Sequence, residues 1–504
     1  MPVAAQAMDA TTPGGLLLVL SVLVPFVGLM LGLLLGGRHA QRVALVTLLA
    51  GLGIVLAIAQ ALVDSDGVLV YLLGGWKPPL GVALRADGLS VVMMLAVAVV
   101  TGFIGIYACG DFGTPPGVRE ARAPFMFWLL LLAMWGSLNL VFVSGDVFTI
   151  YVALELLTFA GVPLVSLDGR SETLQSALRY LLFALLGSMF YLLGAFLLYG
   201  AYGTLDIPQL AADIRPEPIA WTAAALMTVG LIAKTALFPL HLWLPPAHAG
   251  APAAASAVLS ALVIKGAWFL VVRLWLDVFA DVLTLPSAQR GAILVGNVVA
   301  LRQVRLKLLV AYSTVAQIGY LFLMFPLIAG LEAAHMDSAP AVSGGMLQAI
   351  SHATAKAAMF MAAGLIYSTL GHDRVADLRG AARALPMTLV AFALGGASLI
   401  GLPPSGGFLA KWMLLSAAIA TAQWWWALVM LVGGLLTSAY VFMVVVRAMR
   451  PAEPGWTPKK IVPRYQQLAV LALAVCSFVL GVAALCPVDV AQIGRPVMLF
   501  MEAR

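Results

Sequence analysis

Apolar residues form runs of roughly 20 positions along the whole chain, and short polar segments separate one run from the next. The runs lie near residues 15–35, 43–62, 88–108, 124–143, 147–167, 178–200, 221–238, 254–276, 283–301, 308–330, 342–370, 387–414, 425–447 and 466–486. A helix of about 20 apolar residues is long enough to cross the hydrocarbon layer of a membrane. The pattern therefore predicts an all-α polytopic membrane protein with about fourteen transmembrane helices, in which residues 1–504 form a single transmembrane domain.

The ninth run is the weakest, because only Gly291–Leu301 is uninterrupted and that segment alone is too short to span a bilayer. The charges between the runs decide whether this segment crosses. If the ninth run is counted as a crossing, basic residues follow odd-numbered runs along the whole chain. Arg38 and Arg42 follow the first run, and Arg305 and Lys307 follow the ninth. Basic loops face the cytoplasm. The sequence thus predicts a multi-pass protein of the bacterial inner membrane with both termini in the periplasm.

The composition agrees with a protein that lies almost entirely within the bilayer. Hydrophobic residues make up 62% of the chain and charged residues only 10%, against roughly 25% charged residues in soluble proteins. The net charge of +6 reflects the basic cytoplasmic loops, so it does not indicate nucleic-acid binding. The three cysteines show no C-x-x-C spacing, and no glycine-rich phosphate loop follows a strand. We therefore predict no cofactor and no metal site in this chain.

Prolines interrupt two of the apolar runs. Pro239, Pro245 and Pro246 interrupt the seventh, and Pro403 and Pro404 interrupt the twelfth. Proline breaks a helix, and a broken helix is tolerated at membrane depth only where protein or a watery cavity satisfies its backbone. The two broken helices are five crossings apart, an odd number, so the units that contain them are inverted in the membrane. The sequence predicts two inverted repeats, roughly residues 124–276 and 283–447, as in many transporters.

Six ionisable residues lie deep in the apolar runs, where a charge is costly and its default interpretation is functional. They are Glu155, Lys234, Lys265, His352, Lys356 and Lys411. Apolar sequence flanks Glu155, Lys234, Lys265 and Lys411 by many residues, so their charges cannot easily reach the membrane surface. His352 and Lys356 are four residues apart and lie on one helix face. We predict that this set carries the function.

Five further polar residues each allow a functional and a structural interpretation. Asp146 follows Ser-Gly at the start of a run and fits a helix cap as well as an ion site. His241 and His248 flank the proline break, where they either relay protons or satisfy freed backbone groups. Ser313 and Gln317 either line a water path or tie helices together.

Two arginines near the ends of apolar runs need no functional explanation. Arg179 and Arg273 lie close enough to the predicted membrane boundary for a long side chain to reach the interface. For both we expect that the guanidinium snorkels toward the headgroups.

The buried residues suit proton transfer. A low-dielectric site favours the neutral form of a lysine, which can then release and regain a proton. A carboxylate favours the charged form, so a variable distance between Glu155 and Lys234 would act as a switch. The other buried residues of the set could pass protons through ordered water. Because Asp146 and Glu155 are the only obvious carboxylate candidates, proton transfer is favoured over direct sodium binding.

Six segments resemble the antiporter-like membrane subunits that respiratory complex I, Mrp-type multisubunit Na+/H+ antiporters and membrane-bound group 4 hydrogenases share. They are YLLGGWKPPLGVALRADGLSVVMM, SGDVFTIYVALELLTF, AKTALFPLHLWLPPAHAGAPAAASAVLSALVIK, LKLLVAYSTVAQIGYLF, ISHATAKAAMFMAAGLI and GLPPSGGFLAKWMLL. The resemblance covers roughly residues 68 to 440, and GGWKPPLGV looks most like the Mrp-type D subunit and its hydrogenase relatives.

The resemblance implies fourteen core helices in inverted repeats, proton conduction, and other membrane subunits as partners. It assigns the family's membrane glutamate to Glu155 and the lysines of its helices 7, 8 and 12 to Lys234, Lys265 and Lys411. His352 and Lys356 match the histidine and lysine of helix 11.

We therefore expect a proton-translocating subunit of a multisubunit energy-coupling complex in the lipid bilayer, with H+ as the transported ion and Na+ as a candidate second ion. No redox chemistry is expected in the chain itself, although it could serve an NADH-quinone oxidoreductase-type translocase as well as an Mrp antiporter. Two alternatives remain: a self-sufficient proton-coupled carrier of a solute or cation, and a passive scaffold subunit. The series of buried ionisable residues argues against the scaffold.

Overall fold

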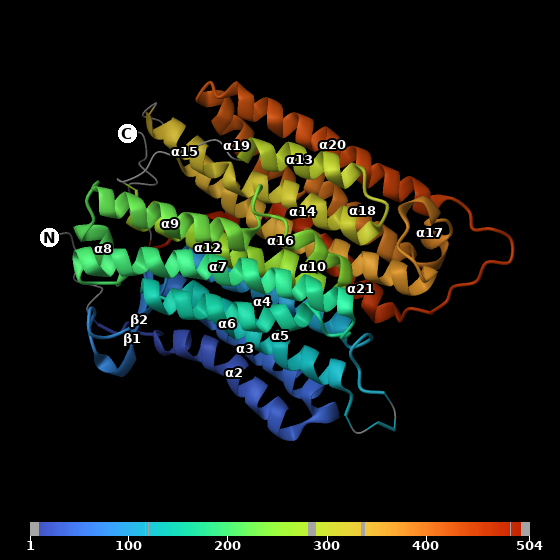
Figure 1. Cartoon of the computed structure of the whole chain (residues 1–504), viewed down its shortest axis with the longest axis horizontal. Coiled ribbons are helices and arrows are strands. Elements are labelled where there is room, and N and C mark those ends of the chain that lie inside the picture. Colours follow the sequence, from blue (N-terminus) through green and yellow to red (C-terminus); the bar gives the residue numbers. More distant parts are fainter. Residues whose placement is uncertain are drawn as a thin grey trace.

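The computed structural model describes residues 10–115, 117–118, 120–280, 289–333, 338–483 and 485–494. Long helices run side by side along the molecule, and a small hairpin lies at one end of the bundle (Figure 1). The hairpin pairs strand β1 (Leu69–Leu72) with strand β2 (Ala83–Ala86) in antiparallel register, Leu69 opposite Ala86. The short 3-10 helix η1 (Leu73–Gly75) begins its turn.

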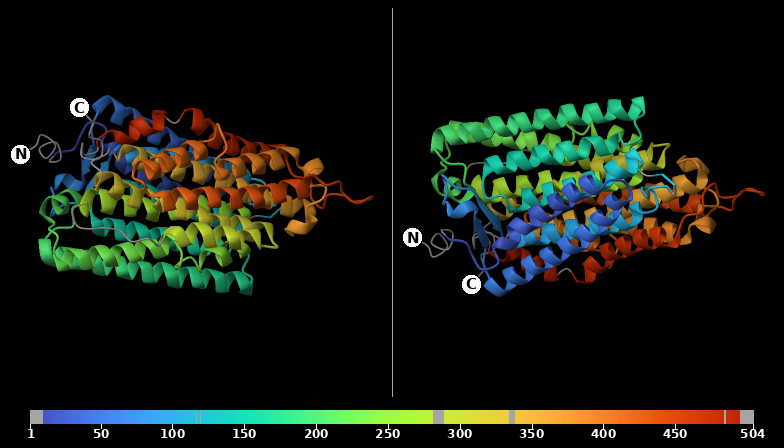
Figure 2. Two further views of the ribbon diagram at one scale, coloured as in Figure 1. Left: turned by 90° about the horizontal axis from the view of Figure 1, so that it is seen from above. Right: turned by 90° about the horizontal axis from the view of Figure 1, so that it is seen from below.

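The helices alternate in direction along the bundle (Figures 1 and 2). The first part of the chain forms α2 (Leu16–Leu35), α3 (Gly37–Ser65), α4 (Gly88–Ala108), α5 (Arg122–Val143), α6 (Val147–Val165), α7 (Ser171–Tyr202) and α8 (Ile207–Asp213). The middle part forms α9 (Pro218–Thr235), α10 (Leu244–Gly250), α11 (Ala253–Val258), the π-helix η2 (Leu259–Val263), α12 (Ile264–Arg273), the π-helix η3 (Leu274–Val278), α13 (Gln289–Leu301), α14 (Leu306–Phe322) and α15 (Met324–Ala333). The last part forms α16 (Ala339–Leu370), the 3-10 helix η4 (Val375–Asp377), α17 (Ala381–Ala384), α18 (Pro386–Ile400), α19 (Gly406–Ala420), α20 (Trp424–Met449), α21 (Arg464–Val482) and α22 (Leu485–Gln492).

The prediction of an all-α polytopic membrane protein is confirmed. Within the described residues, twelve helical segments are long and apolar enough to cross a membrane, and α18 and α19 are two shorter apolar helices. The predicted run 387–414 is therefore two helices with a non-helical segment between them. Helix α13 covers the described part of the ninth run, whose residues 283–288 lie outside the described part of the chain. The count of fourteen crossings stays a prediction.

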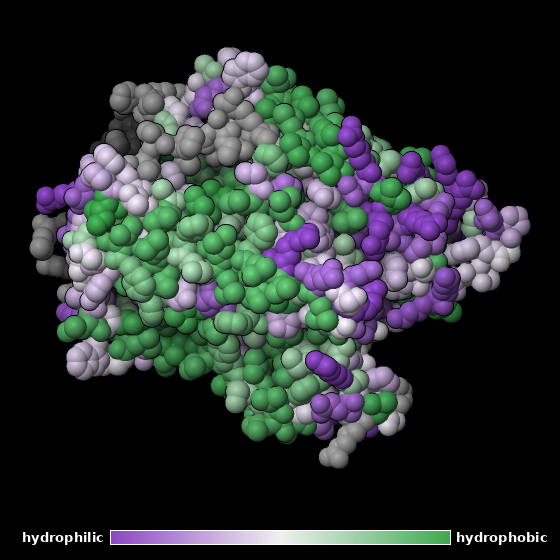
Figure 3. Space-filling view, in the orientation of Figure 1, coloured by the Kyte–Doolittle hydropathy of each residue, from purple (hydrophilic) through white to green (hydrophobic). Residues whose placement is uncertain are grey.

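The outer surface is apolar where lipid would cover it. Large side chains such as Leu34, Leu49 and Leu435 are more than 70% exposed, and Figure 3 shows hydrophobic residues over much of one face, with polar residues gathered toward the end opposite the hairpin. In contrast, α16 is buried along nearly its whole length and forms the centre of the bundle. The polar residues that α16 carries are thus shielded from lipid as well as from water.

The two breaks differ from a simple proline kink. Helix α9 ends at Thr235, and Ala236 adopts the left-handed conformation with φ of 56°. Pro239 lies in the following turn, whereas Pro245 and Pro246 lie in the first turn of α10, where a missing N–H costs little. The Trp243 indole donates to the Ala233 carbonyl at 2.9 Å and so satisfies one of the freed groups.

The second break separates α18 from α19. Gly401 ends α18 with φ of 92°, a conformation that glycine adopts readily. Pro403 and Pro404 follow, and the Ser405 hydroxyl caps α19 by accepting from the Phe408 N–H at 3.1 Å. The end of α18 therefore leaves backbone carbonyls free to bind a side chain.

Polar contacts close the hairpin end of the bundle. Arg273 at the end of α12 donates to Asp87, the cap of α4, at 2.6 and 2.8 Å and to Asp277 at 2.8 Å. The snorkelling interpretation is wrong for Arg273, because two carboxylates hold its guanidinium inside the protein. The Thr12 N–H donates to the Val70 carbonyl, and the Gly88 N–H to the Ile493 carbonyl. Both ends of the described chain thus lie at the hairpin end.

Helices α7 and α9 pack through facing glycines, which allow their backbones to approach closely. A Cβ atom on Gly230 would lie 2.3 Å from the Gly187 carbonyl oxygen, and Lys234 lies one helical turn further along α9. The glycine contact therefore sets the position of Lys234 against α7.

We expect Gly230→Ala to lower the stability of the protein by about 1–3 kcal/mol, since the added methyl group forces the two helices apart. Thermal unfolding of the purified protein in detergent measures the effect as a lower midpoint. Gly200→Ala is the matched control, because Gly200 lies in α7 with open space around it. Equal midpoints for the two variants would contradict the close-packing interpretation.

Candidate functional site

Glu155 and Lys234 form an ion pair between α6 and α9. Lys234 Nζ lies 4.0 Å from Glu155 Oε1 and donates to the Thr158 hydroxyl at 3.0 Å and to the Leu154 carbonyl at 3.5 Å. Glu155 Oε1 is buried and has no hydrogen-bond partner among the described residues. The carboxylate is therefore close enough to attract the lysine but not fixed to it. A small movement of either side chain changes the attraction strongly at this depth.

A small cavity continues from Lys234 toward α12. Its volume is about 10 Å³, and it is lined by Leu154, Leu157, Thr158, Tyr180, Ala184, Lys234, Val263 and Ala267. This is about the smallest space that holds one water molecule. The cavity reaches Val263 and Ala267, which flank Lys265 in the sequence. One water molecule in this cavity would lie between Lys234 and the part of the helix that carries Lys265.

Lys265 and His352 are in direct contact in the centre of the bundle. Lys265 Nζ lies 2.5 Å from His352 Nδ1 and donates to the Ser260 carbonyl at 2.6 Å. Ser260 belongs to the π-helix η2, whose wider turn disrupts the usual carbonyl pairing. When Lys265 carries the proton, Nδ1 accepts and the imidazole proton lies on Nε2. His352 Nε2 has no partner in the described chain, so the ring is able to connect Lys265 to a further group.

Lys356 lies one helical turn beyond His352 on α16 and bonds to α14. Its Nζ donates to the Val310 carbonyl at 2.9 Å and to the Ser313 hydroxyl. The Ser313 hydroxyl in turn donates to the Val310 carbonyl at 2.8 Å. Lys356 is fully buried, so these oxygens replace the water that its ammonium would otherwise bind.

Gln317 connects α14 to the second break. Its Nε2 donates to the Leu399 carbonyl at 3.3 Å, and its Oε1 accepts from Gln348 Nε2 at 3.0 Å. Lys411 Nζ donates to the same Leu399 carbonyl at 2.5 Å and to the Ile400 carbonyl at 3.3 Å. Ser313 and Gln317 are four residues apart on α14 and lie on one face. This face leads from Lys356 to Lys411.

The surroundings of Lys411 differ from those of Lys234. Lys411 Nζ lies 4.2 Å from the ring centroid of Tyr320, a cation–π contact, and the Tyr320 hydroxyl donates to the Met430 carbonyl at 3.0 Å. Gln317 and Tyr320 are three residues apart on α14, as Glu155 and Thr158 are on α6. Gln317 and Lys411 both donate to the Leu399 carbonyl, so a neutral amide lies near Lys411. No carboxylate lies within ion-pair distance of Lys411 among the described residues.

Asp146 caps α6 rather than lying among the buried lysines. Its side chain accepts from the Thr149 N–H at 2.7 Å, and its backbone forms an isolated bridge with Asp206, the cap of α8. Arg85 Nη2 lies 3.3 Å from Asp206 Oδ2. Burial raises the pKa of the Asp206 carboxyl, although the charge of Arg85 opposes the shift. The structure thus gives Asp146 the cap geometry at the hairpin end of the bundle.

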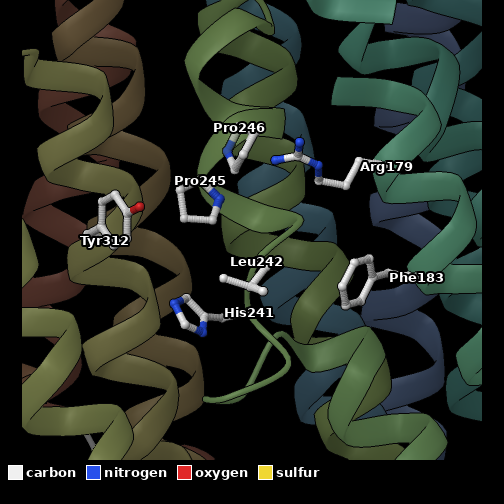
Figure 4. Close-up of a pocket in the computed structure, with 7 residues that line it drawn as sticks. All are labelled: Arg179, Phe183, His241, Leu242, Pro245, Pro246 and Tyr312. Atoms are coloured by element: carbon white, nitrogen blue, oxygen red, sulfur yellow. The ribbon is translucent and has the colours of Figure 1, made fainter. Parts of the chain in front are cut away.

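The two histidines near the first break lie in different surroundings. His248 is fully buried in α10 and stacks on Phe360 of α16 at 4.5 Å, and neither ring nitrogen has a partner in the described chain. His241 lies between α9 and α10 and lines a surface cavity together with Arg179 and Tyr312 (Figure 4). His248 therefore faces the central helix, whereas His241 faces the edge of the bundle.

Some partners that our prediction left out do carry a signal in the sequence. Thr158 is three residues from Glu155, and Gln348 is four residues before His352, so each shares a helix face with a predicted residue. No sequence signal identifies the carbonyls of Ser260, Leu399 and Ile400, because every residue carries a carbonyl. Among the described residues, no group of three or more His, Cys, Asp or Glu side chains could hold a metal ion.

One known protein family matches the part of the chain that contains this site. The family described as NADH:quinone oxidoreductase/Mrp antiporter, TM, matches residues 144–437, a range that contains Glu155, Lys234, Lys265, His352, Lys356 and Lys411.

Similar proteins extend over most of the chain. The N subunit of the NADH-quinone oxidoreductase of Desulforudis audaxviator is 33% identical over 85% of this chain and 90% of the relative. The D subunit of the Na(+)/H(+) antiporter of Alkalihalophilus pseudofirmus is 27% identical over 86% of each chain. A chain in the structure of the Mrp complex from Dietzia sp. DQ12-45-1b has the same fold, with a TM-score of 0.81, 24% identity, and coverage of 94% of this chain and 97% of that one. The chain described here belongs to the NADH:quinone oxidoreductase/Mrp antiporter family of membrane proteins.

Proposed function

We propose that this protein is a proton-translocating subunit of a multisubunit energy-coupling complex. The observation that carries the proposal is the buried row of groups from Glu155 through Lys234, Lys265, His352 and Lys356 to Lys411. Each lysine of this row bonds to neutral oxygens that can stabilise its charge without trapping it. A passive scaffold has no use for such a row, because each buried ionisable group costs free energy.

The pair of Glu155 and Lys234 starts the cycle. When the carboxylate approaches, Lys234 holds its proton; when the carboxylate withdraws, the ammonium loses its main attraction and releases the proton. The proton then passes by the small cavity to Lys265, through His352 to Lys356, and along the α14 face to Lys411. Asp146 stays outside this row as a cap, and His248 contacts α16 through the Phe360 ring.

The names of the relatives favour a subunit over a self-sufficient carrier. One relative is a subunit of an NADH-quinone oxidoreductase and another a subunit of a Na(+)/H(+) antiporter. We therefore expect partner membrane subunits here too, with either redox chemistry or a cation gradient as the driving force. Co-purification from native membranes distinguishes a complex from a lone carrier. The repeat units 124–276 and 283–447 remain our proposal, supported by the position of Lys234 and Lys411 next to the two helix breaks.

We propose that the hairpin end of the bundle faces the periplasm and the opposite end the cytoplasm. The ends of the described chain lie beside the hairpin, and Arg302, Arg305 and Arg374 lie near the opposite end, where Arg305 and Arg374 form an isolated bridge. A reporter that is active only in the cytoplasm should stay silent when it is fused to the C-terminus. The same reporter inserted after Arg379 should be active. An active C-terminal fusion would show that the chain has one crossing fewer than predicted. The ninth run would then be the segment that does not cross, because it is the weakest.

We expect Glu155→Gln to reduce coupled transport by about tenfold or more, because Lys234 loses the charge that controls its proton. Lys234→Ala should have a similar effect, since the row then lacks its first base. The measurement is proton pumping or antiport in membrane vesicles, normalised to the amount of assembled complex. Glu172→Gln is a matched control, because Glu172 is exposed in the first turn of α7. Near-normal transport by both variants would show that Glu155 and Lys234 contribute only to packing.

We expect Lys411→Arg to abolish transport although it keeps the positive charge, because arginine does not deprotonate in proteins. Lys411→Glu should retain part of the activity, since a carboxylate can still gain and lose a proton. A structural cation would show the reverse order. Full activity of the arginine variant would exclude Lys411 as a relay.

The same assay tests whether transport requires a neutral side chain at Gln317. Gln317→Glu places a carboxylate beside Lys411, and an added attraction of only about 1.4 kcal/mol slows proton release about tenfold. Gln303→Glu adds the same charge outside the row and should leave transport unchanged. Equal rates for the wild-type protein and Gln317→Glu would show that the neutral amide is not required.

A further inference from the structure

A cavity opens on the side of the bundle where the first broken helix meets α7 and α14. It encloses about 300 Å³ and is lined by Arg179, Phe183, His241, Leu242, Pro245, Pro246 and Tyr312. The Arg179 side chain extends from α7 toward Pro246, and His241 and Leu242 lie below it (Figure 4). The walls are mostly apolar, and one cation stands at the rim. This combination fits an amphiphile with an anionic head.

Arg179 lies at the depth of lipid headgroups. Helix α7 has 32 residues and is therefore about 48 Å long, about 18 Å more than the hydrocarbon layer. Arg179 comes eight positions, about 12 Å, after Ser171, so a centred helix puts it close to the boundary of the hydrocarbon. Exposed Leu178 and Leu182 neighbour it on α7, and Leu242 is 60% exposed at the cavity. Lipid tails would cover these side chains.

The guanidinium of Arg179 has no acidic partner. It makes no ion pair and no hydrogen bond with any residue that the structure describes. Near the start of α7, Asp168 accepts from Arg170 and Thr173, and Glu172 forms no ion pair with Arg179 in the described chain. On the inner wall, His241 Nδ1 is buried without a partner in the described chain, and His241 is only 8% exposed. The Arg179 guanidinium thus borders the cavity without an acceptor.

We propose that this cavity binds the phosphate of an anionic phospholipid, with Arg179 on the phosphate and an acyl chain between Phe183, Leu242 and Pro246. A guanidinium matches phosphate geometry through paired hydrogen bonds, and this bond is stronger where water is sparse. The apolar walls require a ligand with a hydrocarbon tail, so a lipid fits better than free phosphate. The lipid fills the cavity beside α10, where the first helix is broken. It therefore supports the break that follows Lys234.

Native mass spectrometry of the purified full chain tests this proposal. The delipidated wild-type protein is offered equal amounts of dioleoyl phosphatidylglycerol and dioleoyl phosphatidylcholine. We expect one retained phosphatidylglycerol with a preference of about tenfold, which Arg179→Gln removes and Arg179→Lys partly keeps. Arg42→Gln is the matched control, because Arg42 is also an exposed arginine near a helix start, in α3. This variant should keep the preference.

Three outcomes would overturn the proposal. Equal retention of the two lipids by the wild-type protein would show that the cavity does not select an anion. Displacement of the lipid by excess inorganic phosphate would identify a free-anion site. Retention by the isolated chain but not by the purified complex would identify a partner subunit as the occupant. Because the assay does not measure transport, its result is independent of the proposed proton-translocating function.

Discussion

The structure depends on how a membrane-embedded protein keeps lysines buried with almost no carboxylates. An ammonium removed from water needs replacement oxygens, and unpaired it would destabilise the fold. Five buried or largely buried lysines solve this in one way, by donating to a backbone carbonyl. Lys234, Lys265, Lys307, Lys356 and Lys411 donate to the carbonyls of Leu154, Ser260, Ala251, Val310 and Leu399. A carbonyl is neutral, so it supports the cation without holding the proton as firmly as a carboxylate would.

Three of these five carbonyls belong to irregular backbone. An intact α-helix uses its carbonyls internally, so a disturbed helix offers a freer carbonyl to a side chain. The π-helix η2 disturbs the helix at Ser260, the end of α10 leaves Ala251, and the end of α18 leaves Leu399 and Ile400. Lys234 and Lys356 instead bond to carbonyls within the regular helices α6 and α14, and they add the hydroxyls of Thr158 and Ser313. Irregular backbone therefore supports Lys265, Lys307 and Lys411, whereas hydroxyls supplement the contacts of the other two lysines.

The sequence was sufficient for the parts of this arrangement that depend on residue type. Apolar run length predicted the membrane helices, and lysines within those runs predicted the candidate site, since both signals are strong in a chain with so few charges. Proline placed the breaks only approximately: Pro239 lies in the turn, but Pro245 and Pro246 begin α10. The ion pairs of Arg273 could not be predicted, because Asp87 is 186 residues away and only tertiary packing brings the two together. The carbonyls that accept from the lysines could not be predicted either, since their availability depends on local geometry and not on residue type.

The contact between Lys265 and His352 limits the charge that the centre of the row can carry. At 2.5 Å the two nitrogens share one hydrogen bond, so both cannot be cationic together without a large repulsion. Lys356 lies one turn beyond His352, close enough for its charge to oppose a second charge on the ring. A proton on Lys265 therefore disfavours a second proton on the His352 ring. Glu155 lies 4.0 Å from Lys234 at one end of the row, whereas the neutral amide of Gln317 shares the Leu399 carbonyl with Lys411 at the other end. The two ends of the row therefore differ in charge: a carboxylate lies near Lys234, whereas neutral groups surround Lys411.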